Sequence, residues 1–222
     1  MKNLAGINYL ERKPRVQLEK NPLILLIHGY GSNEEDLFSF AEDLPDEFHV
    51  VSVQAVHTLS FGMYAWYEIN FVNMEKFTNV PQGLASRDKL VEFIDEITRL
   101  ENLDKDNVWL CGFSQGAILS YAIALNYPEK VRHIACLSGY PEPDFWDEID
   151  LTKDYTHLDF FISHGIEDMV IPVEWARKGK PMLEELQIQN EYHEYRSGHG
   201  IVPQNYFDLI AWMKKGLGKI VD

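Results

Sequence analysis

Residues 107–125 are the most informative stretch of this sequence and read NVWLCGFSQGAILSYAIAL. An apolar run that suits a buried strand ends at Phe113, and a helix-like run begins at Gln115. Between them lies Ser114, at the centre of a G-x-S-x-G motif. In a strand, sharp turn and helix of this kind, the hydroxyl projects beyond the sheet, and the glycines avoid collisions that a Cβ would cause. The alternative is a tight turn with an incidental serine.

Short apolar runs alternate with amphipathic runs along the rest of the chain. Strands are predicted at residues 23–27, 49–54, 108–113, 133–138, 159–164 and 191–195. Helices are predicted at residues 34–44, 86–100, 115–125, 173–187 and 205–216. This alternation predicts an α/β fold with a mostly parallel central sheet and helices on both faces. No repeat or linker divides the chain, so residues 1–222 are expected to form one domain.

Two further side chains would complete a nucleophilic site around Ser114. A serine hydroxyl needs a base to take its proton, and a histidine base needs an acid to fix its tautomer. His199, in the loop after the last predicted strand, is the candidate base, whereas His193 lies within that strand. Asp168, in the turn after the strand at 159–164, is the candidate acid, with helix capping as the alternative role. The chain order serine, aspartate, histidine is the order of the α/β-hydrolase fold.

Backbone N–H groups near the nucleophile would stabilise the oxyanion that forms on an attacked carbonyl. The N–H of Gln115, directly after the serine, is one candidate. The glycine-rich loop LIHGYG at residues 26–31 follows a predicted strand and offers the N–H of Tyr30 as the second. This loop lacks the Lys-Ser/Thr pair of a phosphate-binding P-loop. No histidine pair has the spacing of a metal site, so neither a metal nor a cofactor is expected.

A long aromatic segment at residues 57–77 follows the strand predicted at 49–54. Its large side chains are Phe61, Met63, Tyr64, Trp66, Tyr67, Phe71, Met74 and Phe77. Long connections in compact domains are usually functional, and an acyl chain needs apolar cover. We therefore expect this segment to form the acyl-binding wall and to set the preferred acyl length, with Trp66 contributing to that preference. The residues expected to bind substrate are Phe61, Trp66 and Tyr67 from this segment and Val170 from the turn that carries Asp168. The alternative is that these aromatic side chains are ordinary core.

The composition is that of an ordinary globular protein, with 45% hydrophobic residues and a formal net charge of −15. This charge repels phosphate backbones and anionic lipid surfaces, so we expect no nucleic-acid partner. The sequence shows neither a signal-peptide pattern nor a run of transmembrane length, which predicts a cytoplasmic protein without stable membrane insertion. Cys111 and Cys136 lie in apolar runs and are expected to be buried, reduced thiols.

Taken together, the motifs resemble the carboxylesterase, lysophospholipase and acyl-protein thioesterase family of small α/β hydrolases. The matching segments are LIHGYG with Asp36-Leu37, AWYEI, GFSQGA, LSGY, HGIEDMVIP and GHGI, which span nearly the whole chain. The resemblance implies an α/β-hydrolase fold without a large cap domain and no cofactor. It also implies a triad of Ser114, Asp168 and His199, with oxyanion donors at Tyr30 and Gln115.

The predicted function is hydrolysis of a carboxylic ester or thioester through an acyl-enzyme on Ser114, with short-to-medium acyl esters as the small-molecule substrates. An acyl-thioesterase or a lysophospholipase would use the same site, and a non-catalytic ligand-binding protein could keep the same fold. The chain departs from the family pattern at residues 53–57, at Glu68 and at Ala117. The first two changes lie near the expected acyl pocket, where they would affect the choice of substrate. A homodimer is left open.

Overall fold

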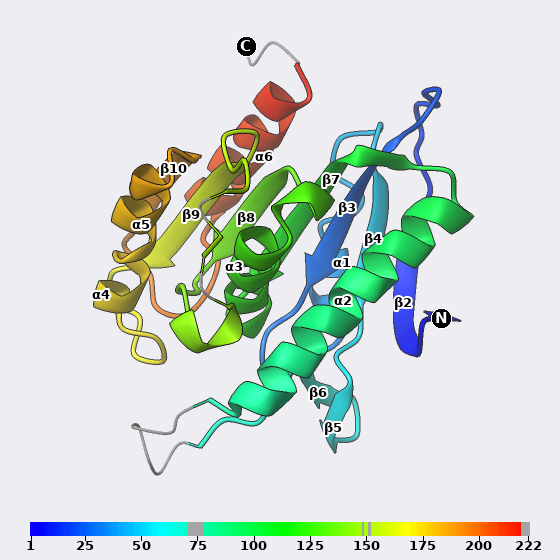
Figure 1. The fold of residues 1–222 in the computed structure, drawn as a ribbon. Helices are drawn as coiled ribbons and strands as arrows, with labels where there is room; N and C mark the ends of the chain where they lie inside the picture. Colours follow the sequence, from blue (N-terminus) through cyan, green and yellow to red (C-terminus); the bar gives the residue numbers. More distant parts are fainter. Residues whose placement is uncertain (71–77, 148, 151, 219–222) are drawn as a thin grey trace.

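A twisted sheet runs through the centre of the computed structural model, which describes residues 1–70, 78–147, 149–150 and 152–218 (Figure 1). Within these residues, the parallel strands are β4 (His49–Val53), β3 (Pro22–Ile27), β7 (Asp104–Phe113), β8 (His133–Leu137), β9 (Asp159–Gly165) and β10 (Gln189–Tyr195). Two antiparallel strands, β2 (Ile7–Arg12) and β1 (Lys2–Leu4), extend the sheet beyond β4. The order β1-β2-β4-β3-β7-β8-β9-β10 confirms the predicted, mostly parallel α/β sheet.

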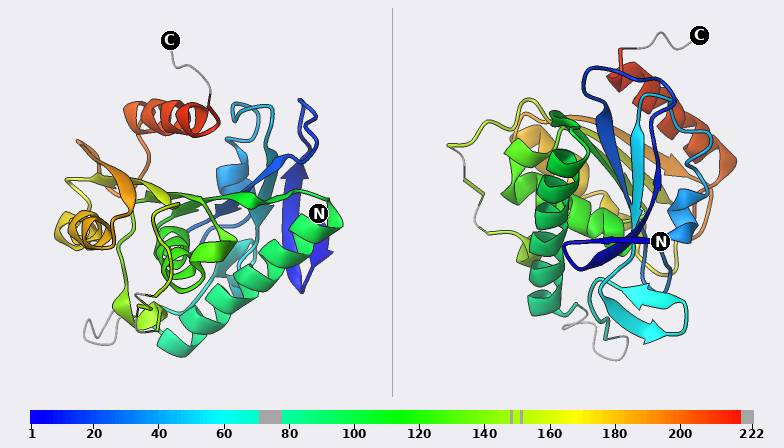
Figure 2. Two further views of the ribbon diagram at one scale, coloured as in Figure 1. Left: turned by 45° about the horizontal axis from the view of Figure 1, so that its top comes forward. Right: turned by 90° about the vertical axis from the view of Figure 1, so that its right-hand side faces the viewer.

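Helices cover both faces of the sheet, as predicted (Figure 2). One face carries α1 (Glu35–Phe38) and α6 (Pro203–Gly216). The other carries α2 (Val80–Leu100), α3 (Gln115–Asn126), α4 (Val173–Ala176) and α5 (Gly179–Glu185). Two short 3-10 helices, η2 (Pro128–Lys130) and η3 (Pro143–Phe145), lie in connections. In the part of the chain that the structure describes, no helix combines the length and apolar character needed to cross a membrane.

Alternate side chains of β3 contribute to two separate cores. All six residues of this strand, PLILLI, are buried, as expected for a parallel strand that is covered on both faces. Leu23 and Leu25 pack in the core that includes α2 and α3. Ile24 and Leu26 pack in the core that includes side chains of α1 and α6. The loop after β3, which carries Tyr30, therefore starts from a rigidly packed strand.

The helix predicted at residues 34–44 was too long. Helix α1 ends at Phe38, and the N–H groups of the next residues bond to carbonyls three residues back. Arg12 reaches across from β2 and donates to the carbonyls of Ala41, Leu44 and Pro45. A side chain from another strand therefore takes up the carbonyls in this region, and the chain continues as turns.

The helix predicted at residues 173–187 is two helices, α4 and α5. The break falls at Arg177, whose guanidinium binds both carboxylate oxygens of Glu194 on β10 at 2.7 and 2.8 Å. Helix α5 then starts at Gly179, which packs so closely that a Cβ there would lie 2.6 Å from the Tyr121 hydroxyl. Contacts with β10 and α3 thus set the two helix positions separately.

The edge strands β1 and β2, and the antiparallel hairpin of β5 (His57–Ser60) and β6 (Met63–Ala65), were not predicted. Strand β2 mixes buried and half-buried residues, and β5 is mostly exposed. Such segments lack the continuous apolar run that marked the central strands. The hairpin follows β4 and projects from the carboxyl end of the sheet (Figure 1).

Cys111 on β7 and Cys136 on β8 are free, buried thiols that face opposite cores. Burial raises the pKa of the Cys111 thiol to about 12 and holds that of Cys136 well above its ordinary value. Both side chains are therefore the buried, reduced thiols that the sequence predicted.

Candidate active site

Ser114 occupies the sharp turn between β7 and α3. Its backbone has φ 53° and ψ −114°, a strained combination for a residue with a side chain. The turn needs both flanking glycines, because a Cβ on Gly112 would lie 2.3 Å from the Gly116 backbone and one on Gly116 would lie 1.9 Å from the Ile27 carbonyl oxygen. The Ser114 N–H donates to the Leu137 carbonyl at 2.9 Å. Two neighbouring strands therefore fix the position of the hydroxyl.

The structure brings His199 and Asp168 to this hydroxyl. His199 Nε2 lies 3.0 Å from Ser114 Oγ, and His199 Nδ1 lies 2.7 Å from Asp168 Oδ2. The Asp168 side chain is fully buried, whereas 18% of the His199 side chain is exposed. Each residue follows a strand end, Ser114 after β7, Asp168 after β9 and His199 after β10. The three residues singled out in the sequence are thus in hydrogen-bond contact.

Four groups surround the Asp168 carboxylate. Oδ1 accepts the backbone N–H groups of Val170 and Ile171 at 2.8 and 2.9 Å. Oδ2 faces His199, and it also lies 3.3 Å from Nε2 of the buried His164. This second histidine contact was not predicted from the sequence. The signal available was the spacing of His164 and Asp168, which lie four residues apart across a strand end.

This geometry suits proton transfer from the serine. A His199 ring that donates its Nδ1–H to Asp168 leaves Nε2 free to accept the Ser114 hydroxyl proton. The positive end of α3 points at the same place, and it stabilises negative charge that develops there. The arrangement can therefore generate a serine nucleophile without a metal ion. Among the described residues, no group of three or more His, Cys, Asp or Glu side chains could hold a metal.

A pocket of about 300 Å³ opens beside the Ser114 hydroxyl. Both expected oxyanion donors, Tyr30 and Gln115, line it. Its apolar lining is Tyr67, Ile69, Phe113, Ile118, Val170 and Ile171. Ile118 was not predicted from the sequence to line the pocket, although a residue one helical turn after Ser114 shares its side of α3. Of the four expected substrate-binding residues, Tyr67 and Val170 lie on the pocket wall.

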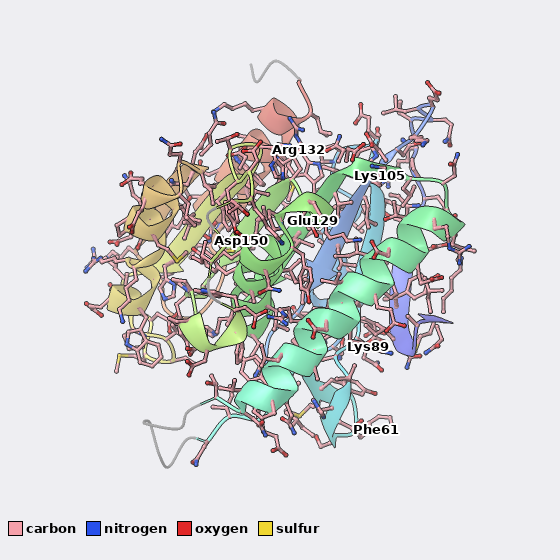
Figure 3. The ribbon with its side chains drawn as sticks, in the orientation of Figure 1. Phe61, Lys89, Lys105, Glu129, Arg132 and Asp150 are labelled. Carbon is pink, nitrogen blue, oxygen red and sulfur yellow. The ribbon has the colours of Figure 1, made fainter. Side chains whose placement is uncertain are left out.

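The other two expected substrate-binding residues, Phe61 and Trp66, do not line this pocket among the described residues, and that part of the expectation was wrong. Phe61 is fully exposed near the tip of the β5–β6 hairpin, which projects away from the sheet (Figure 3). Trp66 is fully buried and packs in the core with α2 and α3. Phe71, Met74 and Phe77, also assigned to the acyl-binding wall, lie outside the described residues.

A mostly parallel sheet whose serine, aspartate and histidine follow strand ends in this chain order has the α/β-hydrolase fold. The described residues add no large cap domain to it. The match to a family model identifies the chain more closely. Residues 14–217 match the model of the Phospholipase/Carboxylesterase family, and the chain belongs to that family.

Named relatives and solved structures agree with this assignment. The chain is 28% identical over 159 residues to the "Probable carboxylesterase" of Oryza sativa subsp. japonica, a match that covers 70% of this chain but only 59% of the rice protein. It is 29% identical over 209 residues to acyl-protein thioesterase 1 of Eremothecium gossypii, with 87% of each chain covered. The crystal structure of the Bacillus cereus carboxylesterase shares the fold, with a TM-score of 0.82, 23% identity and 95% of each chain covered.

Proposed function

We propose that this chain is a serine hydrolase that cleaves carboxylic esters through an acyl-enzyme. The observation that carries the proposal is the chain of contacts from Asp168 through His199 to Ser114, which ends at the mouth of an apolar pocket. An apolar pocket beside an activated hydroxyl suits an acyl group whose carbonyl carbon is to be attacked.

In the first half of the reaction, Ser114 Oγ attacks the carbonyl carbon and its proton passes to His199 Nε2. The backbone N–H groups of Tyr30 and Gln115 donate to the oxyanion of the tetrahedral intermediate. His199 then gives the proton to the leaving alkoxide, which departs as the alcohol. In the second half, His199 takes a proton from water, the hydroxide attacks the acyl-enzyme, and Ser114 regains its proton as the carboxylic acid leaves.

Short-to-medium acyl esters are the substrates we favour, because the pocket holds about 300 Å³ and its apolar walls come from ordered strands, helices and turns. Thioesters are the second candidate. The similarity to acyl-protein thioesterase 1 of Eremothecium gossypii favours them, because it extends over 87% of both chains. The family description, Phospholipase/Carboxylesterase, makes a lysophospholipid the third substrate to test. A cytoplasmic location and a homodimer stay predictions.

The experiment combines a fluorophosphonate probe, which labels activated serines, with esters, thioesters and lysophospholipids of graded acyl length. Ser114→Ala should lose the label and turnover while keeping the fold. Ser138→Ala is the matched control, because Ser138 is also buried after a strand end with a positive φ of 52°, yet its hydroxyl has no hydrogen-bond partner among the described residues. Labelling that persists in Ser114→Ala would contradict the proposal. A wild-type protein that binds esters without labelling or turnover would favour a ligand-binding role.

A further inference from the structure

Trp66 is the residue whose sequence-based role the structure overturned, and its contacts suggest another. Its side chain is fully buried and does not line the pocket described above. Its indole N–H donates to the His28 carbonyl at 2.9 Å, and its backbone N–H donates to the Gln115 side-chain oxygen at 3.1 Å. Its own carbonyl accepts the Ser86 hydroxyl of α2. Trp66 therefore connects three segments that are distant in sequence.

Two of these segments carry the expected oxyanion donors. His28 lies two residues before Tyr30, on the loop that follows β3. Its ring fixes the next peptide, because Nδ1–H donates to the Gly29 carbonyl at 2.7 Å while Nε2 accepts the Ala55 N–H at 3.0 Å. The indole thus holds the carbonyl of residue 28, and the imidazole holds the carbonyl of residue 29.

The second donor segment is held from the same side. The Gln115 side-chain amide accepts from the Trp66 N–H and donates to the Tyr67 carbonyl at 2.8 Å, so both ends of the amide are bound. Gln115 is the first residue of α3, and its backbone N–H follows the nucleophile directly. Residues 66 and 67 consequently fix Gln115 and, through His28, the Tyr30 loop in one arrangement.

We propose that Trp66 is a positioning residue that sets the relative placement of the Tyr30 and Gln115 N–H groups for the developing oxyanion. The proposal rests on the function proposed above. Oxyanion donors accelerate a reaction because they are oriented before charge develops and need no reorganisation. A displacement of about 1 Å is enough to cost roughly 100-fold in rate, so a small movement of either segment would be visible in kcat.

The test is Trp66→Phe, which keeps an aromatic ring and removes the N–H that holds the His28 carbonyl. We expect kcat for a chromogenic ester to fall about 10- to 100-fold with KM changed by less than about 2-fold, because the loss is confined to the transition state. The affinity of a trifluoromethyl ketone, which forms an oxyanion on Ser114, should fall by the same factor as kcat. If the role of Trp66 were purely structural, the substitution would lower Tm and leave kcat, KM and the affinity of the ketone unchanged.

Trp109→Phe is the matched control. Trp109 is equally buried, and its indole N–H donates to Asn107 at 2.7 Å, but it packs in the opposite core. The Trp109→Phe variant should have a lower Tm than the wild type and an unchanged kcat. Gln115→Met supplies a second variant in case Trp66→Phe fails to fold, because it keeps the backbone N–H and removes both side-chain bonds. It should reproduce the fall in kcat at unchanged KM.

The outcomes separate this inference from the proposed function. If the wild-type protein turns over esters and both Trp66→Phe and Gln115→Met keep the kcat of Trp109→Phe, the positioning role is wrong and the hydrolase assignment stands. A rise in KM that accounts for the whole loss would also overturn it, because Trp66 would then act on substrate binding. If the wild-type protein neither reacts with a fluorophosphonate nor hydrolyses any ester, both proposals fail together.

Discussion

Two histidines approach the same carboxylate oxygen, and only one of them is placed to act as a base. His199 Nδ1 lies 2.7 Å and His164 Nε2 lies 3.3 Å from Asp168 Oδ2. The second ring nitrogen of His199 faces Ser114, on a partly exposed loop. The second ring nitrogen of His164 is buried with no hydrogen-bond partner among the described residues. Contact with Asp168 therefore does not decide which histidine acts as the base. What decides it is the environment of the ring nitrogen that points away from Asp168.

The protonation behaviour of His164 fits a neutral role. Burial lowers the pKa of the His164 ring, and the hydrogen bond to the Ile171 carbonyl and the charge of Asp168 oppose this shift only in part. Its Nε2–H donates to the Ile171 carbonyl at 2.9 Å and points near Asp168. A neutral His164 supplies a donor beside the carboxylate without adding a charge that would compete with His199 for it.

The largest expected effect comes from removing the exposed partner of this pair. His199→Ala should lower kcat by about 10⁶-fold, the loss seen when the base of such a triad is deleted. The fold should survive, because the ring lies at the edge of a surface loop. Ester turnover and far-UV circular dichroism would measure the two properties. Turnover within 100-fold of the wild type would show that another group takes the serine proton.

Changing the shared acid should have the next largest effect. Asp168→Asn should lower kcat by about 10⁴-fold, because an amide stabilises the wrong tautomer of His199. The neighbouring Glu167→Gln is the control, since Glu167 is exposed and pairs with Arg196 at 3.3 Å. Steady-state kinetics on both variants decides the assignment. The reverse ranking would place the acid one residue earlier in the chain.

Removing the buried partner should cost stability more than activity. His164→Phe leaves the Ile171 carbonyl without its donor, which should lower the free energy of unfolding by about 1–3 kcal/mol. We expect kcat to fall by less than about 10-fold, because the backbone N–H groups of residues 170 and 171 still hold Asp168. Urea denaturation and ester kinetics test the two halves separately. A loss of kcat comparable with that of Asp168→Asn would make His164 part of the proton-transfer chain.

The smallest effect is a dependence of stability on pH. The pKa values of His164, His28 and His49 are all lowered in the folded state, mainly by burial. The unfolded chain therefore binds protons more readily than the folded protein. The contribution of these histidines to the free energy of unfolding is complete above about pH 6.5 and declines as the pH falls below that value. Each buried ring can contribute at most about 1.4 kcal/mol per pH unit. We expect urea titrations at pH 7.5 and pH 5.5 to give a smaller difference in the free energy of unfolding between the two pH values for His164→Phe than for the wild type.

If the free energy of unfolding of His164→Phe changed with pH as much as that of the wild type, the His164 ring would have the same pKa in the folded and unfolded states. The comparison of the two histidines would then rest on geometry alone.

Much of this site could be anticipated because parallel sheets carry reactive residues directly after strand ends. Ser114, Asp168 and His199 each stood at such a place in the sequence, and the structure brings their side chains together. The pattern also predicted the α/β class, because buried central strands such as β3 are continuously apolar.

The remaining features depend on contacts between segments that are distant in sequence. Arg12 on β2 donates to carbonyls in the turns after α1, and nothing within residues 34–44 indicates that this contact will form. Phe61 and Trp66 look equivalent in an aromatic segment, yet the hairpin exposes the first and the core buries the second. Local patterns report burial of a face, and they do not tell which partner a buried N–H will find.

The two buried thiols can report how often the central sheet of the protein opens to solvent. In the native state Cys111 and Cys136 are shielded on the central strands β7 and β8, and their raised pKa values keep them protonated and unreactive. Alkylation by a maleimide should therefore proceed only when these strands become exposed, so its rate reports the population of open molecules. Because Ser114 directly follows β7, maleimide trapping would report the opening of this part of the sheet, and fluorophosphonate labelling of the same sample would report whether Ser114 is still activated.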